Sequence, residues 1–383
     1  MGILNTHIKL LCDDELICRG FIKVKFKIAK EKKVLVTGGT GFIAGWIIKQ
    51  LVEAGVSVHA TVRDPNDSDK VGHLLELSKK GPGKVILFKA NLLENGSFDA
   101  AMKDCGIVFH TASPFVFKFS DPVKDFIDPA LKGTQNILAA VNSTASVERV
   151  VLTSSCTAIY GDANECEVAP NNTLNEDIWN ITSSVSHQPY SYSKTIAEQE
   201  AWKLAETQDQ WSLVVVNPSL VLGPTVSGKS TSASHDICLQ MGDGTMKAGA
   251  PPFEIGMVDV RDVAEAHIRA AYISGASGRH IISKESCTPL KLSQMLQEKY
   301  GQDYPLPKKE LPKWLIWLVG PFLDKTMTRK IISRNMGHSW RANNSKSKEK
   351  LGIEYRSIEA SINEMFQQMI DEGHLKRSLC NAE

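Results

Sequence analysis

The stretch Lys33-Val34-Leu35-Val36-Thr37-Gly38-Gly39-Thr40-Gly41-Phe42-Ile43-Ala44 decides the fold of this chain. It begins with a short apolar run of the kind found in buried parallel strands, and its glycines follow the spacing Gly38-x-x-Gly41-x-x-Ala44. Apolar residues then recur at helical spacing until Gly55, and Val56–Val62 is typical of a second strand. Strand, glycine turn, helix and strand together predict a βαβ unit.

The glycine turn indicates a nucleotide site. Glycines let the backbone approach a pyrophosphate, and the N-terminus of the following helix presents N–H groups to its negative charge. We therefore predict that Gly38, Gly41, Phe42 and Ile43 bind a dinucleotide cofactor. The spacing differs from the G-x-G-x-x-G form, and a plain βα turn remains the alternative for a glycine pattern taken alone. Ala44 at the last position is small enough for close packing of helix on strand.

The composition is that of an ordinary globular protein. The chain has 383 residues, of which 42% are hydrophobic and 23% charged, and its net charge is +1. A charge balance this close to zero gives no reason to expect nucleic acid or a membrane as a partner. The length allows one large domain or two modest ones, each with ample core.

Cysteines and apolar runs narrow the class of protein further. Eight cysteines are scattered without a C-x-x-C pair, which favours reduced thiols in a cytoplasmic protein and predicts no metal site. No apolar run reaches the roughly 18 residues of a membrane span, and Asp13–Glu15 interrupt the leucines that a signal peptide would need. The short apolar stretch Trp314–Val319 is expected to pack in a second domain or to line a pocket.

The end of the second strand bears on the choice of cofactor. Arg63 follows this strand directly, and Lys70 lies one loop further on. An NADP enzyme usually places an arginine here for the 2′-phosphate, whereas an NAD enzyme places a carboxylate for the ribose 2′-hydroxyl. Arg63 and Lys70 therefore favour NADPH, since both cations can meet a phosphate. Two alternatives stay open: Asp64 would serve NAD in a register shifted by one residue, and both cations could be solvated surface groups.

The third strand is expected at Val85–Lys89, and its end supplies two more candidate cofactor contacts. Asn91 and Leu92 follow the strand, at the corner that normally borders the adenine. Asn91 is equally at home as an ordinary turn residue, so both interpretations remain.

The fourth strand is expected at Ile107–His110, and small residues follow it. Thr111, Ala112 and Ser113 let the backbone approach the cofactor at this strand end. His110 closes an apolar strand, and we expect a structural histidine with satisfied hydrogen bonds there.

Three further residues are candidates for the chemistry. Ser155 follows the fifth strand, Val150–Thr153, and Tyr190 and Lys194 share one face of a helix because they are four residues apart. An unperturbed tyrosine has a pKa of about 10, and a lysine ammonium one turn away predicts a lower one. The phenol could then exchange a proton with a substrate oxygen near neutral pH, while the Ser155 hydroxyl holds the same oxygen.

A Tyr-x-x-x-Lys pair by itself is common on solvated helices. Here it stands behind a dinucleotide turn and a strand that ends in Ser154-Ser155. That combination favours the catalytic interpretation.

Taken in order, these motifs resemble those of the extended short-chain dehydrogenase/reductases, within the NAD-dependent epimerase/dehydratase family. The matching stretches are Thr37–Ala44, Ser155, Tyr190 with Lys194, and Asn217–Pro224. The likeness runs from about Lys33 to about Gly373 and leaves out the first 32 residues. Within that group the chain is similar to the dihydroflavonol reductase-like branch. This branch includes cinnamoyl-CoA reductases and fungal and bacterial aldehyde or ketone reductases.

The resemblance implies a role for each matched position. It implies that Ser155, Tyr190 and Lys194 are the catalytic triad and that the cofactor lies along the strand ends. The implied cofactor contacts are Arg63 and Lys70 with the 2′-phosphate, Asn91 and Leu92 near the adenine, Thr111, Ala112 and Ser113 along the ribose and phosphates, and Pro218 through Val221 beside the nicotinamide.

The chain departs from the pattern of this branch at three places. Asn91 replaces the aspartate usual beside the adenine. Tyr160 stands about where plant flavonoid reductases carry an asparagine, which argues against a flavonoid substrate. Gln188-Pro189 precedes Tyr190, so the Asn-Trp-Tyr stretch of cinnamoyl-CoA reductases has no match.

The expected fold class is α/β: a Rossmann-type doubly wound parallel sheet with a smaller C-terminal substrate domain. We expect an N-terminal extension over residues 1–32 and a dinucleotide-binding domain over residues 33–217, which residues 256–285 rejoin through a strand and a helix. Residues 218–255 and 286–375 would form the substrate domain. Ser227–Ser234, rich in serine, threonine and glycine, is expected to be a mobile loop over the site.

These expectations combine into one hypothesis with two rivals. The hypothesis is a cytoplasmic NADPH-dependent carbonyl reductase, a monomer or homodimer, in which Tyr190 protonates the oxygen of a small-molecule carbonyl substrate and Lys194 also holds the nicotinamide ribose. The first rival is a nucleotide-sugar epimerase or dehydratase with tightly bound NAD, which usually has an acid where Arg63 stands. The second rival is a non-catalytic NADP-sensing protein, against which the intact Tyr190 and Lys194 pair argues.

Overall fold

A parallel sheet forms the centre of the molecule in the computed structural model, which describes residues 26–113, 119–228 and 232–377. Within these residues the sheet has seven strands in the order β3-β2-β1-β4-β5-β6-β9, and every neighbouring pair is parallel. Its strands are β1 (Lys33–Val36), β2 (Ser57–Val62), β3 (Lys84–Lys89), β4 (Cys105–His110), β5 (Arg149–Thr153), β6 (Ser212–Pro218) and β9 (Gly278–Ile282).

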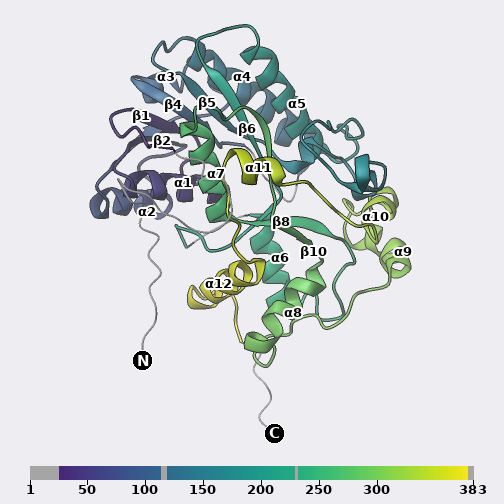
Figure 1. The fold of residues 1–383 in the computed structure, drawn as a ribbon. Coiled ribbons are helices and arrows are strands. Elements are labelled where there is room, and N and C mark those ends of the chain that lie inside the picture. The colour runs from purple at the N-terminus through teal and green to yellow at the C-terminus, as the bar shows by residue number, and fades with distance from the viewer. Residues whose placement is uncertain (1–25, 114–118, 229–231, 378–383) are drawn as a thin grey trace.

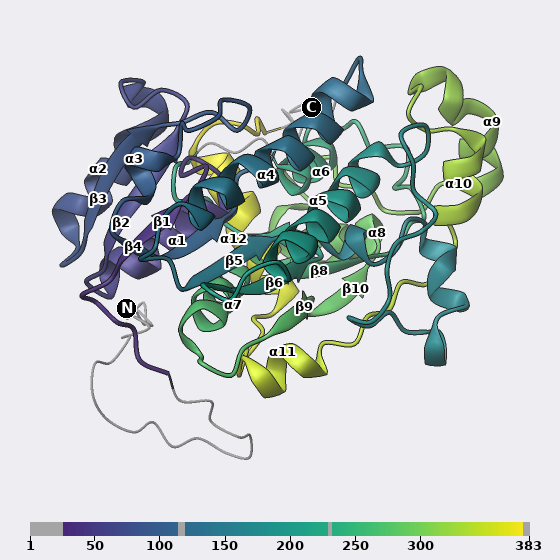
Figure 2. The ribbon, with the colours of Figure 1, turned by 90° about the horizontal axis from the view of Figure 1, so that it is seen from above.

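Helices cover both faces of this sheet, as Figures 1 and 2 show. One face carries α1 (Phe42–Glu53), α2 (Ser68–Lys80) and α7 (Val260–Tyr272). The other face carries α3 (Asp99–Met102), α4 (Asp128–Asn142) and α5 (Pro189–Ala205). Strand order reverses at β1, between β2 and β4, and in such sheets ligands bind at the carboxyl ends of the strands beside this reversal. The predicted Rossmann-type fold is therefore confirmed.

A smaller lobe is built around a second sheet, whose strands come before and after β9 in the chain. Its own sheet pairs β7 (Leu220–Leu222) with β8 (Ile255–Asp259) in parallel and β8 with β10 (Glu285–Cys287) in antiparallel. The further helices are α6 (Ala233–Gly242), α8 (Pro289–Tyr300), α9 (Lys313–Leu323), α10 (Arg329–Asn335), α11 (Ser345–Lys350) and α12 (Ile358–Asp371), and short helical turns lie at Val123–Ile127, Cys156–Ala158, Ala163–Glu167 and Pro170–Asn172.

The strand expected to return to the main sheet lies in the smaller one. Strand β8 pairs with β7 and β10, whereas α7 packs on the main sheet and β9 becomes its edge strand. This part of the expectation was wrong, because a strand-then-helix pattern in the sequence does not indicate which sheet the strand joins. The division of the chain into domains remains a prediction, and residues 1–25 and the centre of Ser227–Ser234 lie outside the described residues.

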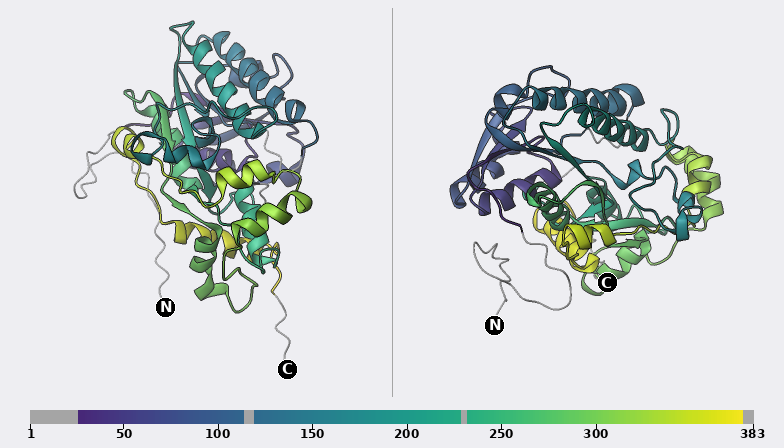
Figure 3. Two further views of the ribbon diagram at one scale, coloured as in Figure 1. Left: turned by 90° about the vertical axis from the view of Figure 1, so that its right-hand side faces the viewer. Right: turned by 45° about the horizontal axis from the view of Figure 1, so that its top comes forward.

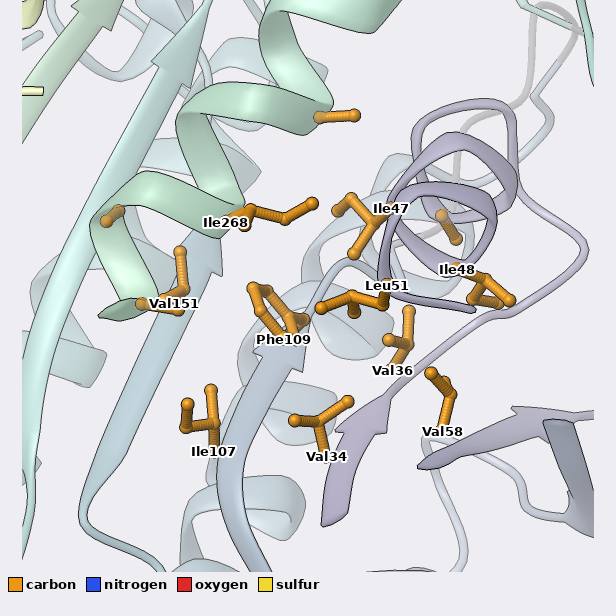
Figure 4. Packing of buried hydrophobic residues seen from close by; sticks show 14 of the residues in the cluster. Val34, Val36, Ile47, Ile48, Leu51, Val58, Ile107, Phe109, Val151 and Ile268 are labelled. Carbon is orange, nitrogen blue, oxygen red and sulfur yellow. The ribbon is translucent and has the colours of Figure 1, made fainter. Parts of the chain in front are cut away.

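The largest hydrophobic core lies between the main sheet and the α1 and α7 helices. Figure 4 shows Leu51 and Ile47 of α1 and Ile268 of α7 pointing toward Phe109 of β4. Leu51, Ile47 and Phe109 are completely buried. Helix α1 thus packs on the sheet through one apolar face, and this packing holds its N-terminus at the glycine turn.

We expect Leu51→Ala to lower the free energy of unfolding by about 2–5 kcal/mol, because it removes a fully buried side chain and leaves a cavity. Leu75→Ala in α2 is the matched control, since Leu75 is 41% exposed and loses little burial. Urea denaturation followed by circular dichroism measures both. Equal effects of the two substitutions would contradict this account of the core.

Candidate active site

The glycine turn between β1 and α1 packs closely against its neighbours. Gly38 has a φ of +68°, and a Cβ added to it would lie 3.1 Å from the Cα of Ala112. The Gly39 N–H donates to the Thr61 carbonyl at the end of β2 (2.8 Å), and the Gly41 N–H donates to the Gly38 carbonyl (2.8 Å). A side chain at Gly38 would strain the backbone and push the β4 end away. The glycines of the turn therefore leave its backbone open to close approach.

Thr37 fastens this turn to the end of β4, and the sequence interpretation missed its role. Its N–H donates to the Phe109 carbonyl (3.0 Å), while its hydroxyl oxygen accepts from the N–H groups of Thr111 (3.1 Å) and Ala112 (3.0 Å). The Thr111 hydroxyl donates to the Thr37 carbonyl in return. The candidate residues Thr111 and Ala112 are thereby held next to Gly38. A threonine between the strand and the first glycine was the sequence feature that could have indicated this.

His110 is structural, as expected. It is buried, with Nδ1 3.2 Å from the Thr37 hydroxyl and Nε2 3.3 Å from the Thr134 hydroxyl on α4. Burial, followed by the charge of Lys194, lowers the pKa of His110 to about 3. The ring is therefore neutral at physiological pH, and both of its nitrogens have hydroxyl partners.

Arg63 and Lys70 lie near the end of β2, close to the glycine turn. Both side chains are exposed, and Arg63 has no hydrogen-bond or ion-pair partner among the residues that the structure describes. Lys70 lies in the first turn of α2 and pairs with Asp67 (2.7 Å). Asp64 accepts the Asn66 N–H (2.9 Å) in a local turn. The carboxylate of Asp64 thus serves its own loop, while the Arg63 guanidinium is open to a ligand.

The end of β3 forms a tight turn. The Asn91 side-chain oxygen accepts the Leu93 N–H (3.1 Å). The Ser97 hydroxyl accepts the Asn91 N–H (3.2 Å) and donates to the Asn91 carbonyl (2.8 Å). Leu92 packs against α4, where its carbonyl accepts from Asn136 (3.1 Å). The turn interpretation of Asn91 is therefore seen in the structure, and any adenine contact by Asn91 and Leu92 remains a prediction.

Ser155, Tyr190 and Lys194 come together at the end of β5. The Lys194 ammonium lies 6.0 Å from the centroid of the Tyr190 ring and donates to the Thr153 carbonyl (3.4 Å), and Ser155 forms a hydrogen bond with Tyr190. Lys194 also lines a small cavity with Ala112 and Ser113 of the β4 end. This cavity lies between Lys194 and the strand end against which the glycine turn packs.

The titration of Tyr190 differs from the expectation. Burial raises the pKa of Tyr190 to about 12, and the hydrogen bond with Ser155 offsets only part of this rise. Burial also lowers the pKa of Lys194 to about 8, with Glu198 acting in the opposite direction. The expected lowering of the tyrosine pKa by Lys194 is therefore not produced by the protein's own groups, because desolvation outweighs a cation 6.0 Å from the ring. Tyr190 is a phenol and Lys194 is predominantly an ammonium at neutral pH.

A buried carboxylate one turn beyond Lys194 supports the site from behind. Glu198 accepts from Arg279 Nε on β9 (2.6 Å), the Ser154 hydroxyl (2.5 Å) and Asn217 of β6 (2.9 Å). The side chains of Glu198 and Arg279 are 0% and 7% exposed. Glu198 thus fixes α5 to β5, β6 and β9. Its place four residues after Lys194, on the same helical face, was the sequence signal for this role.

Asp162 holds the start of the same helix. Its buried carboxylate lies 2.7 Å from His187 Nε2 and accepts from Gln188 (3.3 Å) and from Asn335 of α10 (2.7 Å). Gln188 has a φ of +57°, in the left-handed region, directly before Pro189 opens α5. A strained residue two positions before Tyr190 is therefore stabilised by Asp162, which also links α5 to the smaller lobe.

The two remaining candidates flank the connection between the sheets. Pro218 ends β6 and is buried, whereas Val221 lies in β7 and is half-buried. The structure thus places both after β6, beside the strand end of Ser154 and Ser155, since β5 and β6 are paired neighbours. Within the described residues, no group of His, Cys, Asp and Glu side chains could hold a metal ion.

Comparisons with known proteins identify the family. The model of the NAD dependent epimerase/dehydratase family matches residues 34–281, from β1 to β9. The chain belongs to this family. A cinnamoyl-CoA reductase of Medicago truncatula is 37% identical over 343 residues, which cover 88% of this chain and 95% of the relative. An anthocyanidin reductase of Vitis vinifera is 35% identical over 288 residues, which cover 72% of this chain and 83% of the relative.

A solved structure has the same fold. The structure of Gre2 from Candida albicans in complex with NADPH superposes with a TM-score of 0.71 at 29% identity and covers 89% of this chain and 99% of Gre2. With these relatives, the resemblance to the dihydroflavonol reductase-like branch of extended short-chain dehydrogenase/reductases is confirmed.

We expect Glu198→Gln to lower the free energy of unfolding by about 3–5 kcal/mol, because it leaves the Arg279 guanidinium buried without a counter-charge. Glu206→Gln is the matched control at the exposed end of the same helix, and its effect should stay within about 0.5 kcal/mol. Urea denaturation measures both. Adding Arg279→Met to Glu198→Gln should recover part of the loss. A double-mutant cycle that shows no coupling energy between Glu198 and Arg279 would refute the stabilising role proposed for this ion pair.

Proposed function

We propose that this protein is an NADPH-dependent reductase that transfers hydride to the carbonyl carbon of an aldehyde or ketone, with Tyr190 as the general acid. The observation that carries the proposal is the meeting of Ser155, Tyr190 and Lys194 at the end of β5, next to the strand end that packs on the glycine turn. Membership of the family and the reductases among its relatives support the reaction class.

The glycine turn fits the phosphates of a dinucleotide. A Cβ at Gly38 would fill the space beside Ala112, and no side chain caps the N-terminus of α1 where Phe42 and Ile43 begin the helix. Gly38, Gly41, Phe42 and Ile43 would therefore hold the pyrophosphate through backbone groups, with the positive end of the helix dipole behind them.

The end of β2 fits NADPH better than NADH. Arg63 has no protein partner in the described residues, and the exposed Lys70–Asp67 pair is of the kind that contributes little to stability, so Lys70 is available to an anion. Arg63 and Lys70 would bind the 2′-phosphate. Asp64, the residue that could have served NAD, is engaged in its own turn.

The remaining contacts follow the strand ends. In the proposal, Asn91 and Leu92 border the adenine, Thr111, Ala112 and Ser113 follow the ribose and phosphates, and Pro218 and Val221 lie beside the nicotinamide, where Lys194 also holds the ribose. Bound NADPH would supply the hydride.

The protonation states of the triad suit reduction. A pKa of about 12 keeps the Tyr190 phenol protonated at neutral pH, so it has a proton to give to an oxygen that gains negative charge. Ser155, already bonded to this phenol, would hold the same oxygen and orient the carbonyl. The charged Lys194 ammonium would stabilise the phenolate that remains after transfer, since opposite charges attract strongly in a desolvated site.

We expect Tyr190→Phe to reduce turnover of carbonyl substrates by about 100- to 10,000-fold, the range for loss of a general acid, without weakening NADPH binding. The decrease in NADPH absorbance with a panel of aldehydes and ketones measures turnover, and NADPH fluorescence measures binding. Tyr192→Phe, two residues further along the same helix, is the matched control and should retain activity.

Other outcomes of this experiment distinguish the rival functions. Tightly bound NAD that co-purifies with the protein, with no turnover of any carbonyl, would favour a nucleotide-sugar epimerase or dehydratase. Binding of NADPH that is left unchanged by every carbonyl would favour a sensor. Turnover that survives Tyr190→Phe would refute only the role of Tyr190 as the general acid.

We expect Arg63→Ala to raise the KM for NADPH by about 10- to 150-fold, the loss of a hydrogen bond to a charged group, and to leave the KM for NADH nearly unchanged. The reason is that only NADPH carries the 2′-phosphate. Lys84→Ala is the matched control, because Lys84 is an exposed cation at the start of β3, the end away from the proposed cofactor site. Steady-state kinetics with both cofactors provide the measurement, and equal effects on the two KM values would contradict the role of Arg63.

A further inference from the structure

Helix α9 is exposed although its sequence is apolar. The stretch Trp314–Val319 was expected to pack in a second domain or to line a pocket, but no residue of α9 is buried. Trp314, Phe322 and Leu323 are 68%, 81% and 82% exposed. Trp317 and Leu318 add to the same surface and are also exposed. The expectation that this stretch packs in the second domain was wrong, because hydrophobicity indicates that a segment will be covered but not by what.

The helix is supported from one side only. Gly320 faces the fully buried Ile332 of α10, and Lys313 donates to the Ser333 (3.0 Å) and Met336 (2.6 Å) carbonyls. Figure 2 and the right-hand view of Figure 3 both place α9 and α10 at one edge of the molecule. The exposed apolar side of α9 is therefore a firmly held surface at the rim of the protein.

Cations flank this apolar helix in the sequence. Between Lys308, just before α9, and Lys330, at the start of α10, five cations are exposed. The same segment has two exposed acids, Glu310 and Asp324. The guanidinium of Arg329 lies 4.7 Å from the centroid of the Trp317 ring. The five cations are Lys308, Lys309, Lys325, Arg329 and Lys330. The net charge of +1 for the whole chain thus conceals a local positive concentration.

We propose that α9 and its flanking cations, here called the α9 surface, dock this protein on an anionic phospholipid membrane. Tryptophan, phenylalanine and leucine on one side of a helix with lysine and arginine around it is the composition of helices that lie in the interface of a bilayer. An 11-residue helix is about 16 Å long, roughly half of the 30 Å hydrocarbon core, so α9 lies on the membrane and does not cross it.

The charges favour a membrane over a second copy of this chain. A symmetric dimer through the α9 surface would bring the same five cations of two protomers together, and like charges repel. An anionic leaflet instead attracts each cation near its surface. The sequence-based expectation of no membrane partner rested on whole-chain charge and therefore did not detect this surface. In the described residues, no helix is long and apolar enough to span a bilayer.

The test is co-sedimentation of the full chain with vesicles of phosphatidylcholine alone and of phosphatidylcholine mixed with phosphatidylserine. We expect binding to the anionic vesicles that weakens as salt is added, with a blue shift of tryptophan fluorescence. Trp314→Ser with Phe322→Ser should abolish binding. Lys325→Ala with Lys330→Ala should weaken it about fivefold for each cation removed.

Matched controls lie at the opposite edge of the molecule, on α2 and β3 (Figure 2). Leu75→Ser with Ile86→Ser removes two exposed apolar residues, and Lys80→Ala with Lys84→Ala removes two exposed cations. Both pairs should leave vesicle binding unchanged, and every variant should retain NADPH binding as evidence of folding.

Three results would overturn the proposal. The first is no binding to anionic vesicles, and the second is equal losses in the α9 variants and the controls. The third is a dimer in size-exclusion chromatography that Trp314→Ser with Phe322→Ser dissociates while vesicles remain unbound, since a second copy would then cover this surface.

Discussion

The close approach of the β1–α1 turn to the strands on either side is the constraint on which the candidate site depends. Gly38 touches Ala112 of the β4 end, Gly39 bonds to the β2 end, and Thr37 accepts two backbone N–H groups from the residues after β4. These contacts bring three strand ends to one place. They also hold the N-terminus of α1 there, because the buried face of α1 fixes the helix on the sheet (Figure 4). The proposed phosphate site and the strand ends that surround it are thus parts of one packing arrangement.

Helix α5 depends on two buried carboxylates that the chemistry does not use. Glu198 joins it to Arg279 at the sheet edge, and Asp162 joins its first residues to α10 of the smaller lobe. Buried charges are tolerated here because each carboxylate has several hydrogen-bond partners. The position of Tyr190 and Lys194 therefore reflects contacts made far along the chain. This arrangement also connects the lobe that carries the α9 surface to the helix that carries the proposed acid.

Local patterns were enough to predict much of the fold. Strands β1 to β5 and helix α1 follow from apolar periodicity and from glycine positions. Among the candidate residues, the pairing of Tyr190 with Lys194 followed from their spacing, since residues four apart share a helical face. The spacing of residues in the sequence does not indicate which distant segment supplies the partner of a given residue. The pairing of β8 with β10, the bond between Glu198 and Arg279 and the contacts of Asp162 all join residues far apart in the chain.

The sequence by itself determined the glycine turn, the order of strands and helices, the tyrosine and lysine on one face, and the family to which they belong. These features depend on residue type and short spacing, which folding does not alter. Only the tertiary structure decided the pKa of Tyr190. The neighbouring Lys194 predicted a lower pKa, whereas burial raises it. It also decided that Trp314 and Phe322 face outward. Burial is a property of the whole packed chain, and for that reason neither result could be obtained from local sequence.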